Sequence, residues 1–187
     1  MASVLDSAVE VYRNVVDRSG WGEGPWDAED IDKMVWVDSD TDLDCMIVRN
    51  RMGAWCGYVG VGPRHPLHGV GYGLCTLGDA CDSEEYEIWC EHRPDSILQP
   101  HGGVTFSDFC VEDGDPAGSI CHIAQEGRPS KVWWFGFDCG HAFDVIPYMV
   151  RDRELGFALR RDEATYKTME YAISEVRELA RQLAEVR

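Results

Sequence analysis

Six consecutive apolar residues, 132–137, constrain the fold of this chain more than any other feature. Four of the six are aromatic, and the run is too short for an ordinary helix. It therefore predicts a strand that is buried on both faces of a sheet. Because successive side chains of a strand point to opposite faces, Trp134, Gly136 and Asp138 should share one face. Asp138 then leaves the sheet beside a glycine, where a ligand has room.

The segment directly after this strand is rich in side chains that can do chemistry. Cys139, His141 and Asp144 follow Asp138 within six residues. A turn at this place would bring a thiol, an imidazole and two carboxylates together. Residues 138–144 are therefore a candidate site, although they name no reaction.

Length and composition indicate one globular domain. The chain has 187 residues, 44% of them hydrophobic, which is enough for a full core. No apolar run approaches the roughly 20 residues that span a membrane, and residues 1–6 lack the basic region and apolar stretch of an export signal. We expect a soluble intracellular protein that does not enter membranes.

The cysteines give a second indication of the compartment. There are eight, an even number that in a short secreted chain would suggest disulfides. Without an export signal we expect all eight to be reduced thiols. No Cys-x-x-Cys pair occurs, so the strongest signature of a structural zinc site is missing.

The charge is strongly negative and unevenly placed. The formal net charge is −17, yet residues 150–187 hold eight acidic and eight basic side chains, so the excess of acid lies in residues 1–149. Nucleic-acid binding depends on Lys and Arg that neutralise phosphates, so we expect no direct nucleic-acid binding. The acidic surface either provides solubility or docks on a basic partner, including by imitating nucleic acid.

Periodicity predicts a helix at each end of the chain. Residues 2–17 have apolar side chains at helical spacing, with Ser3 as a cap. Residues 162–187 contain no Gly or Pro, have a cap in Asp162, and repeat apolar residues three and four apart. The stripe comprises Tyr166, Met169, Ile173, Val176, Ala180 and Leu183.

Strands are predicted between the two helices. Residues 45–50 and 54–61 fit a hairpin with Gly53 at a positive-φ position, and residues 103–108 and 131–138 read as further strands. Residues 30–37 are expected to begin a strand. The predicted fold is therefore one α+β domain over residues 1–187, in which a sheet core at 45–150, mostly antiparallel or mixed, is flanked by the N-terminal and the long C-terminal helix.

Two familiar ligand-binding motifs are excluded. Asp38, Asp40, Asp42 and Asp44 alternate as in a calcium loop, but leucine and arginine occupy the places of the turn glycine and the bidentate glutamate at residues 43 and 49. We interpret this segment as a solvated acidic turn. The glycines do not have the spacing of a dinucleotide-binding or phosphate-binding loop.

Several motifs resemble those of a family of proteins encoded by actinobacterial phages. The matching segments are Trp134-Phe-Gly-Phe-Asp-Cys-Gly-His141 with Asp144, His101-Gly-Gly-Val-Thr105, residues 56–61, residues 65–69 and the helix 166–183. The resemblance covers roughly residues 50–187. It implies a phage origin and a location in the cytoplasm of the host cell, and it implies no particular reaction.

The leading hypothesis for the site is a divalent metal, such as zinc, or a small polar ligand. His65, His101, Asp138 and His141 are the candidate ligands, with Thr105, Cys139 and Asp144 behind them. Such a set with one open position suits an ion that activates water for hydrolysis. Gly103 and Gly136 support it, because a glycine inside a strand is easier to understand where a ligand approaches.

Three alternatives remain open. Cys90 and His92 with Cys139 and His141 would make a closed zinc site, and Cys139 activated by a histidine would be a nucleophile. In the third, the protein is no enzyme: the polar residues shape a turn, and the acidic body binds and inhibits a host protein. The sequence leaves the oligomeric state open.

Overall fold

A six-stranded sheet forms the centre of the molecule in the computed structural model, which describes residues 4–76, 91–110, 117–121, 125–151 and 164–186. Every neighbouring pair of strands is antiparallel, and the order is β1-β2-β3-β4-β6-β5. The strands are β1 (Ala8–Arg13), β2 (Ile31–Val37), β3 (Asp44–Arg49), β4 (Trp55–Val61), β5 (Phe106–Asp108) and β6 (Trp133–Asp138). The predicted α+β class is confirmed.

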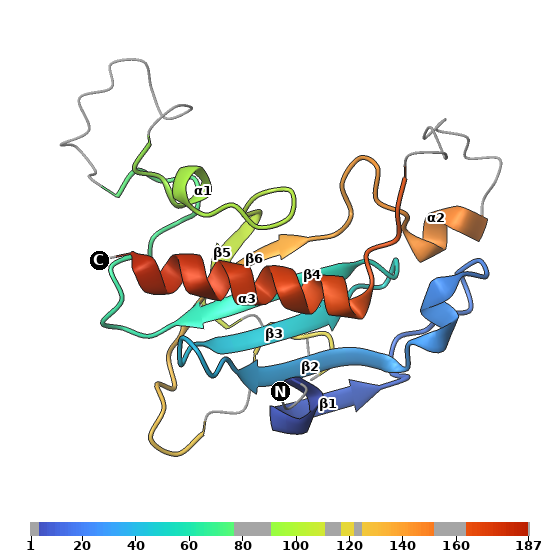
Figure 1. The fold of residues 1–187 in the computed structure, drawn as a ribbon, viewed down its shortest axis with the longest axis horizontal. Coiled ribbons are helices and arrows are strands. Elements are labelled where there is room, and N and C mark those ends of the chain that lie inside the picture. Colours follow the sequence, from blue (N-terminus) through green and yellow to red (C-terminus); the bar gives the residue numbers. More distant parts are fainter. Residues whose placement is uncertain (1–3, 77–90, 111–116, 122–124, 152–163, 187) are drawn as a thin grey trace.

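The long C-terminal helix α3 (Met169–Glu185) lies across one face of this sheet, mainly on β3 and β4 (Figure 1). The shorter elements are the 3-10 turns η1 (Val4–Ser7) and η2 (Pro25–Ala28), and the helices α1 (Pro94–Ile97) and α2 (Pro147–Arg151). The larger part of the core lies between α3 and the sheet, where Trp55, Phe135 and Val176 are fully buried. No helix among the described residues is both long and apolar enough to cross a membrane.

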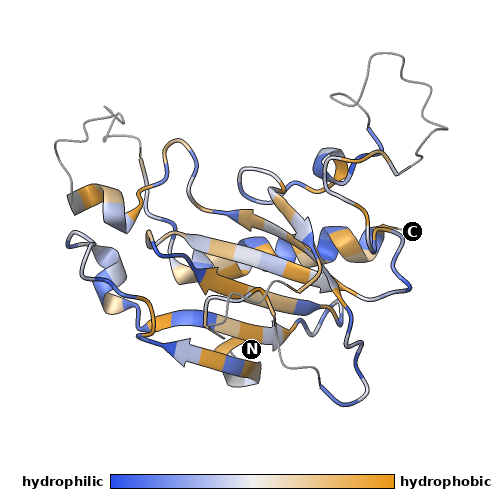
Figure 2. Cartoon of the chain, turned by 180° about the vertical axis from the view of Figure 1, so that it is seen from behind, coloured by the Kyte–Doolittle hydropathy of each residue, from blue (hydrophilic) through white to orange (hydrophobic). Residues whose placement is uncertain are grey.

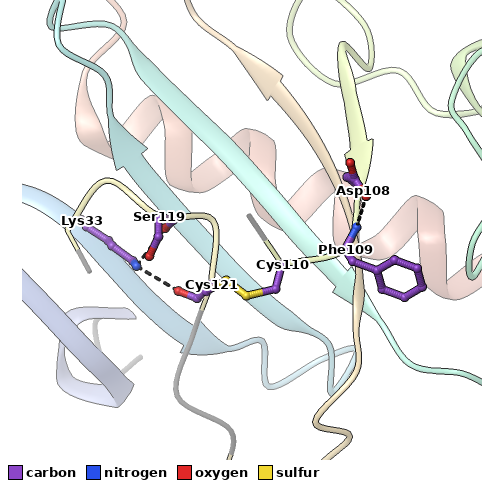
Figure 3. Close-up of a disulfide and its surroundings, with 6 residues drawn as sticks. All are labelled: Lys33, Asp108, Phe109, Cys110, Ser119 and Cys121. Carbon is purple, nitrogen blue, oxygen red and sulfur yellow. Dashed lines mark hydrogen bonds between the residues drawn. A yellow bond between two sulfur atoms is a disulfide. The ribbon is translucent and has the colours of Figure 1, made fainter. Parts of the chain in front are cut away.

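Hydrophobic residues also mark the strands in the view from the side of the sheet opposite α3 (Figure 2). Because side chains alternate along a strand, Met46 and Trp134 point away from α3, opposite to Ile47 and Phe135 of the first cluster. Met46, Trp134 and their neighbours form a second buried cluster there, and Ile120 packs against it. The loop 117–121 is held to this region by a buried lysine, because Lys33 Nζ donates hydrogen bonds to the carbonyls of Ser119 (3.0 Å) and Cys121 (2.9 Å) (Figure 3).

A disulfide between Cys110 and Cys121 fastens the same loop to the end of β5 (Figure 3). The two Cα atoms lie 4.9 Å apart, within the usual range for a disulfide. The prediction of eight reduced thiols is therefore wrong at these two positions, because the fold brings together two cysteines that the sequence pattern gave no reason to pair. Cys45, Cys56 and Cys139 are free thiols.

The predicted N-terminal helix is wrong. Residues 4–13 form η1 and then β1, which pairs antiparallel with β2; residues 2 and 3 lie outside the described part. The apolar residues at helical spacing also include β-branched valines, which suit a strand. Hydrogen bonding to β2 favours the strand over the helix, and the sequence of residues 4–13 alone does not indicate this pairing.

The C-terminal helix exists but begins later than predicted. Its N-cap is Thr168, whose hydroxyl accepts a hydrogen bond from Tyr171 N, whereas Asp162 lies outside the described residues. Residues 164–168 remain non-helical because Thr165 pairs with the backbone of Phe143 and Val145. The buried stripe comprises Ala172, Val176, Leu179, Ala180 and Leu183, while Ile173 is half-buried.

The central strand and the hairpin agree with their predictions. Strand β6 lies between β4 and β5, and its first five residues are buried. Strands β3 and β4 pair across a turn in which Gly53 has a φ of +92°. The end of β6 and the first turns of α3 place the polar residues described next.

Candidate metal site

His101 and Asp144 form the centre of a polar cluster beside the first turns of α3. His101 Nε2 lies 2.7 Å from Asp144 Oδ2, and its Nδ1 lies 2.9 Å from the hydroxyl of Tyr171. The backbone N–H of His101 donates to Glu175 Oε2 at 2.8 Å. Asp144 is only 3% exposed. The His101 imidazole thus lies between a buried carboxylate and a hydroxyl that α3 supplies.

His141 completes the cluster from the turn after β6. Its backbone N–H donates to Asp144 Oδ2 (3.0 Å), and Asp144 N donates to the carbonyl of His141 (3.0 Å), which closes a tight turn. His141 Nδ1 lies 3.9 Å from Asp144 Oδ2 and 4.0 Å from Asp138 Oδ1, and it is buried without a hydrogen-bond partner. One ligand atom each from His101, His141 and Asp144 lies within 4.8 Å of the others.

Asp138 and Thr105 lie on the more open side of the cluster. Thr105 Oγ1 donates to Asp138 Oδ2 at 3.2 Å, and Gly140 N donates to Asp138 Oδ1 at 2.9 Å. The side chain of Asp138 is 38% exposed. Asp138 can therefore meet solvent and a ligand together, whereas Asp144, predicted to stand behind the ligands, lies at the centre.

The cluster carries more negative than positive charge. Asp138, Asp144 and Glu175 are opposed by Lys167, whose Nζ lies 3.5 Å from Asp144 Oδ1. Burial, followed by the charge of Glu175, raises the pKa of Tyr171 to about 12. Burial and the nearby carboxylates also raise the pKa of the Cys139 thiol, which is 2% exposed. A negative potential of this kind favours a cation and opposes a reactive thiolate at Cys139.

The glycines near the cluster do not all act as expected. A Cβ at Gly102 would lie 2.2 Å from the His141 ring, and Gly102 has a φ of +67°, so glycine allows the two histidine segments to meet. A Cβ at Gly103 would meet nothing within 4 Å. The space at Gly136 is filled by the ring of Tyr58 rather than left for a ligand.

The structure does not bring His65 to this cluster. His65 Nε2 lies 2.9 Å from the carbonyl of Leu183 in the last turn of α3, and its Nδ1 accepts from Leu67 N at 3.1 Å. Twelve residues of helix separate Leu183 from Tyr171, or roughly 18 Å. Of the predicted residues, the fold thus gathers His101, Asp138, His141, Thr105 and Asp144, with Cys139 buried beside them. Cys90, needed for the alternative zinc site, lies outside the described residues.

Sequence reasoning missed Tyr171 and Glu175. Both contact His101 from the predicted C-terminal helix, where only the apolar stripe was considered. Their spacing of four residues places them on one helix face and was the one available signal.

The acidic turn before β3 differs from the solvated turn that we expected. Asp38 and Asp44 are buried, and Arg177 and Arg128 form ion pairs with them at 3.2 Å and 3.0 Å. A surface hollow lined in part by Asp40, Ser174 and Arg181 lies beside this turn and contains none of the cluster residues.

Comparison of the chain with protein-family models, with curated proteins and with solved structures found no match.

Proposed function

We propose that His101, His141 and Asp144 bind a divalent metal ion and that the protein is a metal-dependent hydrolase. The observation that supports this proposal is the unpaired Nδ1 of His141, which is buried 3.9 Å from Asp144 and 4.0 Å from Asp138. A buried polar atom without a partner is costly, and a bound cation would remove that cost. The turn that places it is held by two hydrogen bonds between His141 and Asp144.

The donor set suits zinc or a similar ion. Two imidazole nitrogens and one carboxylate oxygen are the protein ligands of several hydrolytic zinc sites, in which water takes the fourth position. Around one tetrahedral ion such donors lie roughly 3.3 Å apart. The His101 pair with Asp144, at 2.7 Å, would open slightly and the His141 pair, at 3.9 Å, would close.

Charge supports the same proposal. Three carboxylates and one ammonium leave the cluster with an excess of two negative charges, which a divalent ion would balance. The ion would lower the pKa of a bound water and polarise a carbonyl or phosphoryl group. Asp138, which is partly exposed and held by Thr105, would accept the proton of that water.

Metal content of purified protein tests this proposal. We expect about one zinc or other divalent ion per chain in the wild type, and loss of it in His101→Ala and His141→Ala. His65→Ala is the matched control, since the ring of His65 binds Leu67 and the other end of α3, away from the cluster. Thermal unfolding of each variant checks folding. A wild type that takes up no ion, or equal uptake in all four proteins, would contradict the site.

Turnover tests the reaction separately. Nitrophenyl esters and phosphate esters are suitable probes, and Asp138→Asn should retain the ion but lose most activity, by roughly 10²-fold or more. Bound metal without turnover of any probe would reject the hydrolase and keep the metal site. Absence of both metal and turnover would favour the alternative proposal, an acidic protein that binds and inhibits a host protein. The phage origin is part of both proposals.

A further inference from the structure

Tyr171 and Glu175 hold His101 from one face of α3. The Tyr171 hydroxyl lies 2.9 Å from His101 Nδ1, and Glu175 accepts the His101 backbone N–H at 2.8 Å. The rings of His101 and Tyr171 meet edge to face, with centroids 5.4 Å apart. This set fixes both the position and the plane of the imidazole, which leaves Nε2 pointed at Asp144.

The first turn of α3 is itself anchored. Tyr171 N donates to the hydroxyl of Thr168, and Met169 N donates to Glu29 Oε1 at 3.0 Å. Glu29 is in turn bound by Arg49, which is fully buried. The backbone of Tyr171 is therefore held in place, and its hydroxyl reaches His101 without a movement of the helix.

The hydroxyl of Tyr171 must suit either position of the proton on the His101 ring. In a neutral His101 whose Nε2 donates to the Asp144 carboxylate, Nδ1 has no proton and accepts from the Tyr171 hydroxyl. A metal ion on Nε2 needs the lone pair of that nitrogen, so the proton must then be on Nδ1. The partner of Nδ1 must change from donor to acceptor.

We propose that Tyr171 is the positioning residue that makes this exchange possible, acting through His101. A hydroxyl is both a donor and an acceptor. With the ion bound, the Tyr171 oxygen accepts from Nδ1–H, and its own proton turns to Glu175, the carboxylate one helical turn further on. The proposal rests on the metal site proposed above. It adds the Tyr171 hydroxyl as the partner of His101 Nδ1 in both the metal-free and the metal-bound state.

Zinc affinity of matched variants tests the role of Tyr171. Competition with a chromophoric chelator should show Tyr171→Phe binding zinc roughly 10- to 100-fold more weakly than the wild type, the usual effect of losing a partner behind a histidine ligand. Tyr148→Phe, at an exposed position of α2, should bind as the wild type does. Equal affinity of Tyr171→Phe and wild type would overturn this role but not the metal site.

The position of the proton gives a readout that a merely structural role would not move. In ¹⁵N-labelled protein, the imidazole nitrogen shifts of His101 should report a proton on Nε2 without metal and on Nδ1 with zinc. A proton already on Nδ1 in the metal-free protein would overturn the exchange. No zinc binding by the wild type would overturn both the metal site and this inference, so the two failures are distinguishable.

Discussion

Histidines contact helix α3 at both of its ends, and the two contacts differ in what they leave unsatisfied. At the C-terminal end, His65 uses one ring nitrogen on the Leu183 carbonyl and the other on Leu67 N. At the N-terminal end, His101 meets a buried carboxylate, and the neighbouring His141 keeps a buried nitrogen without a partner. Both ring nitrogens of His65 have hydrogen-bond partners, so His65 leaves no nitrogen for a ligand and its contact with α3 is structural.

The surroundings of each histidine, rather than the histidine itself, distinguish the two ends. An imidazole near a helix C-terminus finds carbonyl acceptors that lack helical partners, so a structural role is the default there. The cluster at the other end also gathers acidic side chains and one lysine from separate segments. Convergence of charge, rather than the presence of histidine, separates the two ends.

The largest effect is expected from a change between the two ends. Val176 is fully buried in the core under α3. Val176→Asp should lower the free energy of unfolding by about 3–5 kcal/mol, because an unpaired charge enters an apolar site. Ile173→Asp should cost less, since Ile173 is half-buried, and exposed Ser174→Asp should cost little. Urea unfolding measures all three, and equal stabilities would mean that α3 is not packed on the sheet.

A change on the opposite face should leave both ends of α3 as they are. Replacing Cys110 and Cys121 by serine opens the disulfide of the loop that covers Lys33. We expect a loss of roughly 3 kcal/mol, the usual effect of removing a short disulfide-closed loop, with zinc affinity unchanged. Thiol titration of the denatured, unreduced wild type should leave these two cysteines unreactive. Full reactivity would show that the bond does not form.

The smallest effects separate the two ends directly. Thr168→Ala removes the N-cap of α3 and His65→Ala removes the side chain bound to its last turn, so each should cost about 1 kcal/mol in thermal or urea unfolding. Only Thr168→Ala should also weaken zinc binding, by a few-fold, because Tyr171 lies in the turn that Thr168 caps. Equal zinc affinity in the two variants would mean that the two ends of α3 do not differ in their relation to the metal site.

The local sequence pattern was enough to predict an element where only one structural preference was present. The aromatic run 132–137 predicted β6 because a short, aromatic-rich apolar run suits a buried strand, and Gly53 predicted the hairpin because the turn needs a positive φ. Pattern failed at residues 4–13, where helical spacing and β-branched residues compete and pairing with β2 decides. It also misplaced the start of α3, which depends on Thr165 pairing with a distant turn.

The sequence alone was enough to predict an α+β fold with a central aromatic strand and, directly after it, residues 138–144 of the proposed site. Tertiary structure alone decided which histidines join them, because His101 arrives through the bend at Gly102 and through contacts with Tyr171 and Glu175 on α3. It also paired Cys110 with Cys121 and set His65 aside. Periodicity reports what each segment buries, whereas a site depends on distances between segments, which only the packed chain fixes.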